Sequence, residues 1–250
     1  MQFAFSRVVP DFVVRSAVAE CSSSRNLGEY AVSARSDIRS PASLPAAPSF
    51  FGIICASEGE KIKPRLYILA GANGSGKSTI SKVLLPSEGL VYVNPDDIAK
   101  EISPANPSAA KIEAGKETLR RIASMFERRE SFAIESTLSG SVYVKVIERA
   151  KLLGYDVIIA YIFVDSPDVC IRRIEARMRS GGHFVPAGDV VRRYSRSKYN
   201  FVNIYRGMAD HWLLYYNGGT DFSLVAHGNG DTNIISKERY EAFMEGLCRK

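Results

Sequence analysis

A glycine-rich loop follows one short apolar run of the chain, and its residue types are those that bind polyphosphate. Residues 71–79 read GANGSGKST and satisfy the pattern GxxxxGK[ST] at every defined position. In such a loop the glycines let backbone N–H groups turn towards a β-phosphate, the lysine reaches the β and γ oxygens, and the serine hydroxyl binds Mg²⁺. The helix expected over 77–85 points its positive N-terminus at the same phosphates. The sequence therefore predicts that ATP and Mg²⁺ are bound by Gly71, Ala72, Asn73, Gly74, Ser75, Gly76, Lys77, Ser78 and Thr79, with Ser78 as the metal ligand.

Two further apolar runs end in carboxylates. Asp96 and Asp97 follow the run 90–94, and Glu135 lies near the end of the run 131–136, with hydroxyl residues after it. The carboxyl ends of parallel strands meet at the sheet edge where ligands bind. A carboxylate at that edge can orient an acceptor hydroxyl and take its proton during phosphoryl transfer. The alternative role is a cap for the helix that begins there, and we expect that role for Asp97 rather than Asp96.

A cationic segment at 166–200 carries eight basic and three acidic side chains around a pair of adjacent glycines. Arg173 and Arg177 are four residues apart, so they share one face of the expected helix. A lid of this kind closes over ATP and brings guanidinium groups to the charge that develops on the transferred phosphoryl group. We expect Arg177 to act in this way, with Arg192 or Arg193 next. The other cations fit an ordinary solvated helix face.

The elements that must position these residues follow from the hydrophobic pattern. From Arg65 onward, short apolar runs alternate with amphipathic segments, which is typical of βα units that feed a parallel sheet. Apolar residues at helical spacing from Ile112 to Phe126 predict a crossover helix, and Ser166 with Pro167 predicts the start of another. The predicted fold class is α/β, a kinase-like P-loop NTPase with a parallel sheet, helices on both faces and an arginine-rich helical lid. The expected strands are 65–70, 90–94, 131–136, 155–164 and 222–228.

The composition indicates one folded domain in a chain of 250 residues. Residues 1–62 lack periodicity and are rich in Ser, Ala and Pro, so we expect a disordered leader there. Residues 63–250 then form the P-loop kinase domain, with its lid at about 166–200. No apolar run approaches the ~18 residues that span a bilayer, so no membrane contact is expected. Four scattered cysteines without metal-ligand spacing suit a reducing cytoplasm.

The net charge of +6 is concentrated in one place. Residues 166–200 account for +5 of it and residues 1–64 for +1, so the rest of the chain is neutral in sum. A duplex partner would favour basic residues spread over a whole face. The local patch instead suits a polyphosphate ligand, and no nucleic acid partner is expected.

The ordered set of motifs resembles the zeta toxin family of P-loop kinases over about residues 65–228. The resemblance is to the short chromosomal members rather than the longer plasmid-borne toxins. The motifs that carry it are AGANGSGKST (70–79), VNPDDIA (93–99), AIESTLSG (133–140), IFVDSP (162–167), RMRSGGHFVP (177–186) and RRYSRSKYNF (192–201).

Members of that family look like UDP-N-acetylglucosamine kinases that phosphorylate the 3′ hydroxyl of the sugar. The resemblance implies a small-molecule acceptor of the UDP-sugar class, with an antitoxin protein as a candidate partner. It also implies that Asp96 is the general base and that Arg177 bridges towards the transferred phosphate, with Lys77 as the P-loop lysine. His183 stands where the longer toxins place a second phosphate-binding arginine. The implied substrate-binding residues are Asp96, Glu135, Thr137 and His183.

Two other functions remain open from the residues alone. The first is a P-loop kinase for another sugar, a nucleoside or a cofactor precursor. The second is a regulatory module whose partner reads its nucleotide state. Asp165 resembles a Walker B carboxylate that would hold magnesium, and the alternative role is a contact to the helix that begins at Pro167. Asn217 and Gly218 are candidates for a place near the adenine, from their position in the sequence alone.

Overall fold

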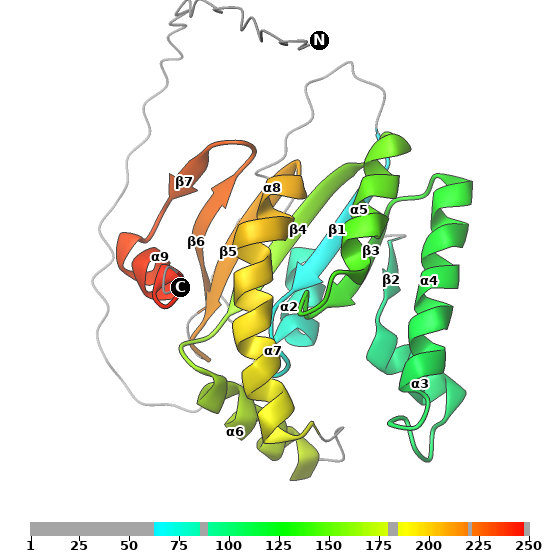
Figure 1. The fold of residues 1–250 in the computed structure, drawn as a ribbon, viewed down its shortest axis with the longest axis horizontal. Coiled ribbons are helices and arrows are strands. Elements are labelled where there is room, and N and C mark those ends of the chain that lie inside the picture. The colour runs from blue at the N-terminus through cyan, green and yellow to red at the C-terminus, as the bar shows by residue number, and fades with distance from the viewer. Residues whose placement is uncertain (1–62, 86–89, 180–184, 220–221, 248–250) are drawn as a thin grey trace, which may run out of the picture. The chain divides into compact units, whose positions relative to one another are not determined.

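The computed structural model describes residues 63–85, 90–179, 185–219 and 222–247. Within these residues, strands and helices alternate through most of the chain, as Figure 1 shows. The strands are β1 (Arg65–Ala70), β2 (Val91–Val93), β3 (Phe132–Ser136), β4 (Asp156–Phe163), β5 (His211–Asn217), β6 (Phe222–Gly228) and β7 (Thr232–Ile234). The helices are α2 (Lys77–Leu84), α3 (Pro95–Ile102), α4 (Lys111–Arg128), α5 (Val142–Leu152), α6 (Pro167–Arg179), α7 (Ala187–Asn200), α8 (Arg206–Met208) and α9 (Lys237–Met244), with a π-helical turn at Phe201–Tyr205.

The seven strands of the described residues form one sheet in the order β2-β3-β1-β4-β5-β6-β7. Strands β1, β2, β3, β4 and β5 are parallel, as the sequence predicts. Strand β6 pairs antiparallel with β5, and β7 pairs antiparallel with β6. The expectation that 222–228 joins the parallel pattern is therefore wrong. Only a few residues separate β5 from β6, and a parallel crossover needs a dozen or more. Strand β5 itself is absent from the predicted strands.

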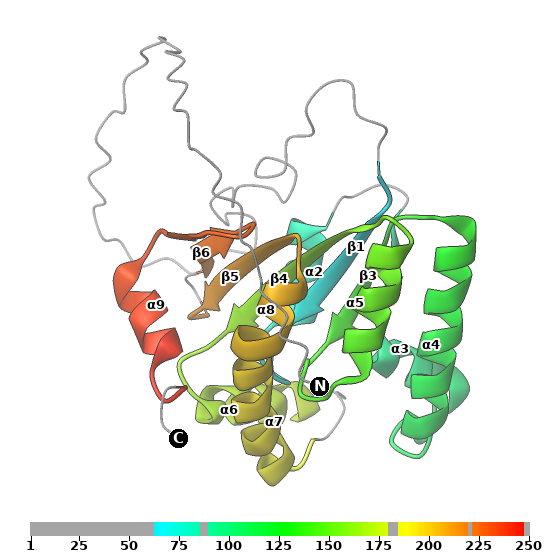
Figure 2. The same ribbon diagram turned by 45° about the horizontal axis from the view of Figure 1, so that its top comes forward.

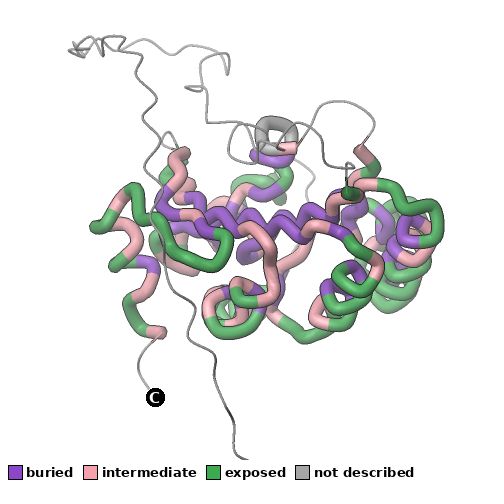
Figure 3. Tube along the Cα trace, turned by 90° about the horizontal axis from the view of Figure 1, so that it is seen from above, coloured by how far each residue is buried: buried purple, intermediate pink, exposed green. Residues whose placement is uncertain are grey.

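The central strands of the sheet are buried on both faces, because apolar side chains of the sheet pack against helices on each side. In β4, Val157, Ile159 and Tyr161 face one hydrophobic cluster, and the alternate residues face another. The first cluster is completed by side chains of α4, α5 and α9 and of the π-helical turn, the second by α2. Figure 1 shows α4, α5 and α7 in front of the sheet and α2 behind it. Seen from above, the buried residues follow the strands while the helices expose their outer faces (Figure 3).

The parallel register brings the expected functional segments to one edge. Ala70 at the end of β1 pairs with Ser136 on one side and with Tyr161 on the other, so the loops after β1, β3 and β4 begin close together. Helices α6 and α7 lie next to each other at the same end of the sheet, as Figure 2 shows. Gly181 and Gly182, the pair of adjacent glycines in the cationic segment 166–200, lie outside the described residues. The segments that should bind the nucleotide, the acceptor and the phosphoryl group therefore converge.

Among the described residues, no helix combines the length and hydropathy needed to cross a membrane.

Candidate active site

The glycines of the 71–79 loop are required by its geometry. Gly71 has φ +140°, and a Cβ there would lie 2.2 Å from the carbonyl oxygen of Ile162. Gly76 has φ +96°, and a Cβ there would lie 2.2 Å from Asn217 Nδ2. Both positions therefore exclude any other residue. Gly76 is also the N-cap of α2 and has no side chain for the free N–H groups of the first turn, which leaves them available to an anion.

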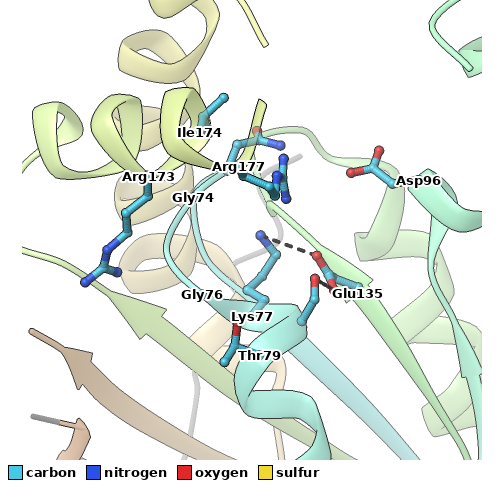
Figure 4. A pocket seen from close by; sticks show the side chains of 11 residues that line it. Gly74, Gly76, Lys77, Thr79, Asp96, Glu135, Arg173, Ile174 and Arg177 are labelled. Atoms are coloured by element: carbon cyan, nitrogen blue, oxygen red, sulfur yellow. Dashed lines mark hydrogen bonds and ion pairs between the residues drawn. The ribbon is translucent and has the colours of Figure 1, made fainter. Parts of the chain in front are cut away.

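Lys77 is held inside this loop. Its side chain is 6% exposed, and Nζ donates to the carbonyl oxygens of Gly71 and Ala72, each at 3.0 Å. Nζ also lies 3.6 Å from Oε1 of Glu135, and Figure 4 shows the two side chains pointing towards each other. A buried lysine is stable only with such partners. The Lys77 ammonium therefore stands at the floor of the loop, where phosphate oxygens would enter.

Glu135 connects the loop to the neighbouring strands. Its Oε2 accepts hydrogen bonds from Ser78 Oγ at 2.9 Å and from Tyr92 Oη at 2.5 Å. Burial and the Glu135 carboxylate raise the pKa of Tyr92 well above its usual range, so the phenol remains a donor. The sequence predicted roles for Glu135 and Ser78, but it did not predict that they bind each other, and it missed Tyr92.

Asp96 and Asp97 have different surroundings at the start of α3. The N-cap of this helix is Asn94, whose side chain accepts from the Asp96 backbone N–H at 3.0 Å, with Pro95 at the first helical position. The expectation that Asp97 caps the helix is therefore wrong. Its carboxylate accepts from Asn94 Nδ2 at 3.0 Å and from Lys100 Nζ at 2.9 Å.

Two cavities meet at the end of the sheet. We call them the P-loop pocket, of about 360 Å³, and the side pocket, of about 230 Å³. The P-loop pocket (Figure 4) is lined by Asn73, Gly74, Gly76, Lys77, Ser78, Thr79, Asp96, Glu135, Arg173, Ile174 and Arg177. The side pocket is lined by Asn73, Lys77, Asn94, Pro95, Asp96, Glu135, Ser136, Thr137, Tyr143 and Arg193. Four residues line both pockets: Asn73, Lys77, Asp96 and Glu135.

Some arginines of the cationic segment line the two pockets, and others do not. Arg177 is exposed, reaches into the P-loop pocket from α6, and makes no hydrogen bond or ion pair with the described residues. Arg193 lines the side pocket, and its Nη1 lies 3.5 Å from Asn73 Oδ1. Arg192 instead pairs with Asp189 at 2.8 Å and lines neither pocket. Of the two candidates after Arg177, the structure therefore brings Arg193, and not Arg192, to the site.

A tight turn after β3 forms one wall of the side pocket. Thr137 Oγ1 lies 2.9 Å from Ser139 Oγ, and the buried Leu138 between them has φ +50°, which is strained for a residue with a Cβ. Asn200 on α7 donates to the Leu138 carbonyl at 2.8 Å and fixes this turn. The helix that carries Arg193 thus also supports Thr137. His183, the remaining expected substrate-binding residue, lies outside the described residues.

Strand β5 supports the loop from the other side. Asn217 Nδ2 donates to the Ser75 carbonyl at 2.8 Å, and the Asn217 carbonyl accepts from Arg173 Nη2 at 3.1 Å. Asn217 therefore contacts the phosphate loop directly. Asp165 accepts from Tyr216 Oη at 2.9 Å and lines neither of the two pockets.

The fold is of the P-loop kinase class. Residues 55–221 match the zeta toxin family, and the chain belongs to that family. A protein of Haemophilus influenzae, described as uncharacterized, is 36% identical over 124 residues, which span 50% of this chain and 88% of that protein.

Two solved structures share the fold at 18% identity. The AvrRxo1-ORF1:-ORF2 complex with ATP has a TM-score of 0.59 and covers 72% of this chain. This chain spans 63% of that neighbour, less than two thirds of its length. The PezAT chromosomal toxin–antitoxin system of Streptococcus pneumoniae has a TM-score of 0.54, with 76% of this chain and 81% of that chain covered.

Proposed function

We propose that this chain transfers the γ-phosphoryl group of ATP to a hydroxyl group of a small-molecule acceptor. The observation that carries the proposal is the junction of the two pockets, where Asp96 lines both and Lys77 forms their common floor. A nucleotide in the P-loop pocket would place its terminal phosphate at this junction, because Lys77 reaches the β and γ oxygens. An acceptor in the side pocket would then present its hydroxyl to the same point.

Asp96 is the proposed general base. Its carboxylate has no hydrogen bond from the described residues and is exposed to the junction, so it is free to accept a proton from the acceptor. Arg177 and Lys77 supply positive charge on the side of the transferred phosphoryl group. Thr137, Tyr143 and Arg193 give the side pocket hydroxyl and cationic donors, which suits a polar, anionic acceptor.

The residues beside Lys77 fit a magnesium ion. Mg²⁺ takes hard oxygen ligands and is bound through one or two protein oxygens together with phosphates and water. Ser78 Oγ and Glu135 Oε2 are two such oxygens, 2.9 Å apart in the P-loop pocket. When bound, the ion would neutralise charge on the β and γ phosphate oxygens. ATP as the nucleotide is supported by its presence in the AvrRxo1-ORF1:-ORF2 complex.

The acceptor class we propose is a UDP-sugar, with UDP-N-acetylglucosamine and its 3′ hydroxyl as the specific candidate implied by family membership. The test is incubation of the purified chain with ATP, Mg²⁺ and a panel of UDP-sugars and free sugars. We expect one UDP-sugar to be phosphorylated, and NMR of the product to place the phosphate on the 3′ oxygen. Phosphorylation of free sugars in preference to every UDP-sugar would contradict this acceptor while leaving the kinase intact.

An antitoxin protein is the proposed partner, since the S. pneumoniae neighbour belongs to a toxin–antitoxin system. Growth of a bacterial host that expresses the chain, compared with a Lys77→Ala variant, tests the premise. We expect only the unmodified chain to inhibit growth. Equal growth of both cultures would remove the reason for an antitoxin.

Arg177→Ala is expected to lower kcat by about 10² to 10³, because a cation on the developing phosphoryl charge is lost. The melting temperature should change little, since Arg177 is exposed and bonds to no described residue. The matched control is Arg172→Ala, which removes an exposed arginine of the same helix that lines neither pocket. Kinetics and thermal unfolding of both variants check this. Unchanged kcat with a lower melting temperature would assign Arg177 to the fold.

A further inference from the structure

The side chain of Tyr92, on β2, reaches Glu135 on the neighbouring strand β3. On β2 it pairs with Ala133 of β3, and Glu135 is the next β3 residue on the same face. Diagonal neighbours of this kind are within reach of an aromatic side chain. The small side chain of Ala133 leaves room for the ring, which packs against the hydrophobic cluster under α2 that contains Tyr67 and Ile80. The backbone register and this packing therefore fix where the phenol lies.

Two hydrogen-bond donors and one cation hold the Glu135 carboxylate. Ser78 Oγ and Tyr92 Oη both donate to Oε2, at 2.9 and 2.5 Å, and Lys77 Nζ lies 3.6 Å from Oε1. Two of these three groups, Lys77 and Ser78, are ones that the ligands engage. When nucleotide and metal bind, phosphate oxygens compete for Lys77 and Mg²⁺ competes for the Ser78 oxygen. Tyr92, which lines neither pocket, is the donor that the ligands do not engage.

We propose that Tyr92 is a positioning residue for the metal site, which holds Glu135 in place after Lys77 and Ser78 have turned to the nucleotide. The inference rests on the proposed function of the pocket. Without the phenol, the Glu135 carboxylate is free to turn away from Ser78 and from the position of the metal, which weakens the metal site but leaves the phosphate contacts of the loop in place. Partners of metal-binding residues commonly change metal affinity by about 10- to 100-fold when they are removed.

The experiment is calorimetric titration of Tyr92→Phe with ADP, with and without Mg²⁺. The ring is kept and only the hydroxyl is lost, so the fold should persist. Without Mg²⁺ we expect ADP affinity within about twofold of the unmodified chain, and the gain in affinity on adding Mg²⁺ should fall about tenfold. The control is Tyr155→Phe, which also loses a phenol hydroxyl. This hydroxyl donates to the carbonyl oxygens of Met125 and Glu130, outside the lining of both pockets, so the variant should keep the full gain in affinity on adding Mg²⁺.

A double-mutant cycle shows whether Tyr92 acts through Glu135. In a Glu135→Gln background the Mg²⁺-dependent gain should already be reduced, and Tyr92→Phe should add less than about twofold. Additive losses, or a full gain in Tyr92→Phe, would overturn the inference. If Tyr92→Phe does not fold, a full gain in Glu135→Gln overturns it equally, because the carboxylate then does not serve the metal. A missing Mg²⁺ effect in the unmodified chain would instead contradict the proposed function.

Discussion

Asp96→Asn is expected to lower the rate of phosphoryl transfer by about 10² to 10⁴ and to leave ATP affinity almost unchanged. The amide keeps the shape of the carboxylate but cannot accept the proton of the acceptor hydroxyl. The folded structure does not depend on this carboxylate, because the Asp96 backbone N–H, and not its side chain, makes the capping contact with Asn94. Transfer rates at saturating acceptor and ATP titrations of the same preparation measure the two quantities separately.

Asp97→Asn is the matched control for this prediction. Asp97 is adjacent in sequence and also exposed, but its side chain bonds to Asn94 and Lys100 and lines neither pocket. An exposed ion pair such as Asp97–Lys100 contributes little to stability, so both transfer rate and melting temperature should stay close to those of the unmodified chain. An inactive Asp97 variant beside an active Asp96 variant would reassign the base. Two active variants would favour the regulatory module.

Lys77→Ala is expected to lower transfer by at least about 10³ and to weaken ATP binding as well. The ammonium is the one buried cation among the described residues that line the P-loop pocket, so solvent does not replace it. Its removal also leaves Ser78 and Tyr92 as the donors to the Glu135 carboxylate among the described residues, and this carboxylate lies beside the position of the phosphates. The resulting repulsion of the nucleotide adds to the lost attraction.

Lys100→Ala is the control for Lys77, because it removes an exposed lysine that lines neither pocket. Initial rates at several ATP concentrations separate the loss in kcat from the loss in affinity. Lys100→Ala should behave as the unmodified chain. A Lys77→Ala variant with normal turnover would contradict the whole proposal, since no other described residue takes its place in the loop.

The elements that carry local patterns could be predicted from the sequence. The loop 71–79 is defined by residue types at fixed spacing, and its glycines meet backbone or side-chain atoms that leave no room for a Cβ. The buried strands β1 and β4 follow from short apolar runs, and α4 from apolar residues at helical spacing. The Asn94 cap could also have been found, because an asparagine followed by proline is a common start of a helix.

The contacts that join separate elements could not be predicted in the same way. Tyr92 meets Glu135 through the β2–β3 register, and Asn217 meets Ser75 across 142 positions of sequence. Neither contact leaves a local pattern, because both depend on which strands become neighbours. Strand β5 was missed because its aromatic run follows the π-helical turn and α8 closely and has no separate turn signal. Which of Arg192 and Arg193 reaches the site likewise depends on which face of α7 is turned towards the pockets.

The fate of the γ-phosphoryl group tests the central claim most directly. The purified chain is incubated with Mg²⁺ and ATP labelled on the γ-phosphate, with and without a UDP-sugar panel, and the label is traced to acceptor or to inorganic phosphate. We predict that release of ADP depends on the acceptor and that the label appears on it in equal amount. Slow release of inorganic phosphate at the same rate with every acceptor and with none would contradict the account and indicate a regulatory nucleotide-binding module instead.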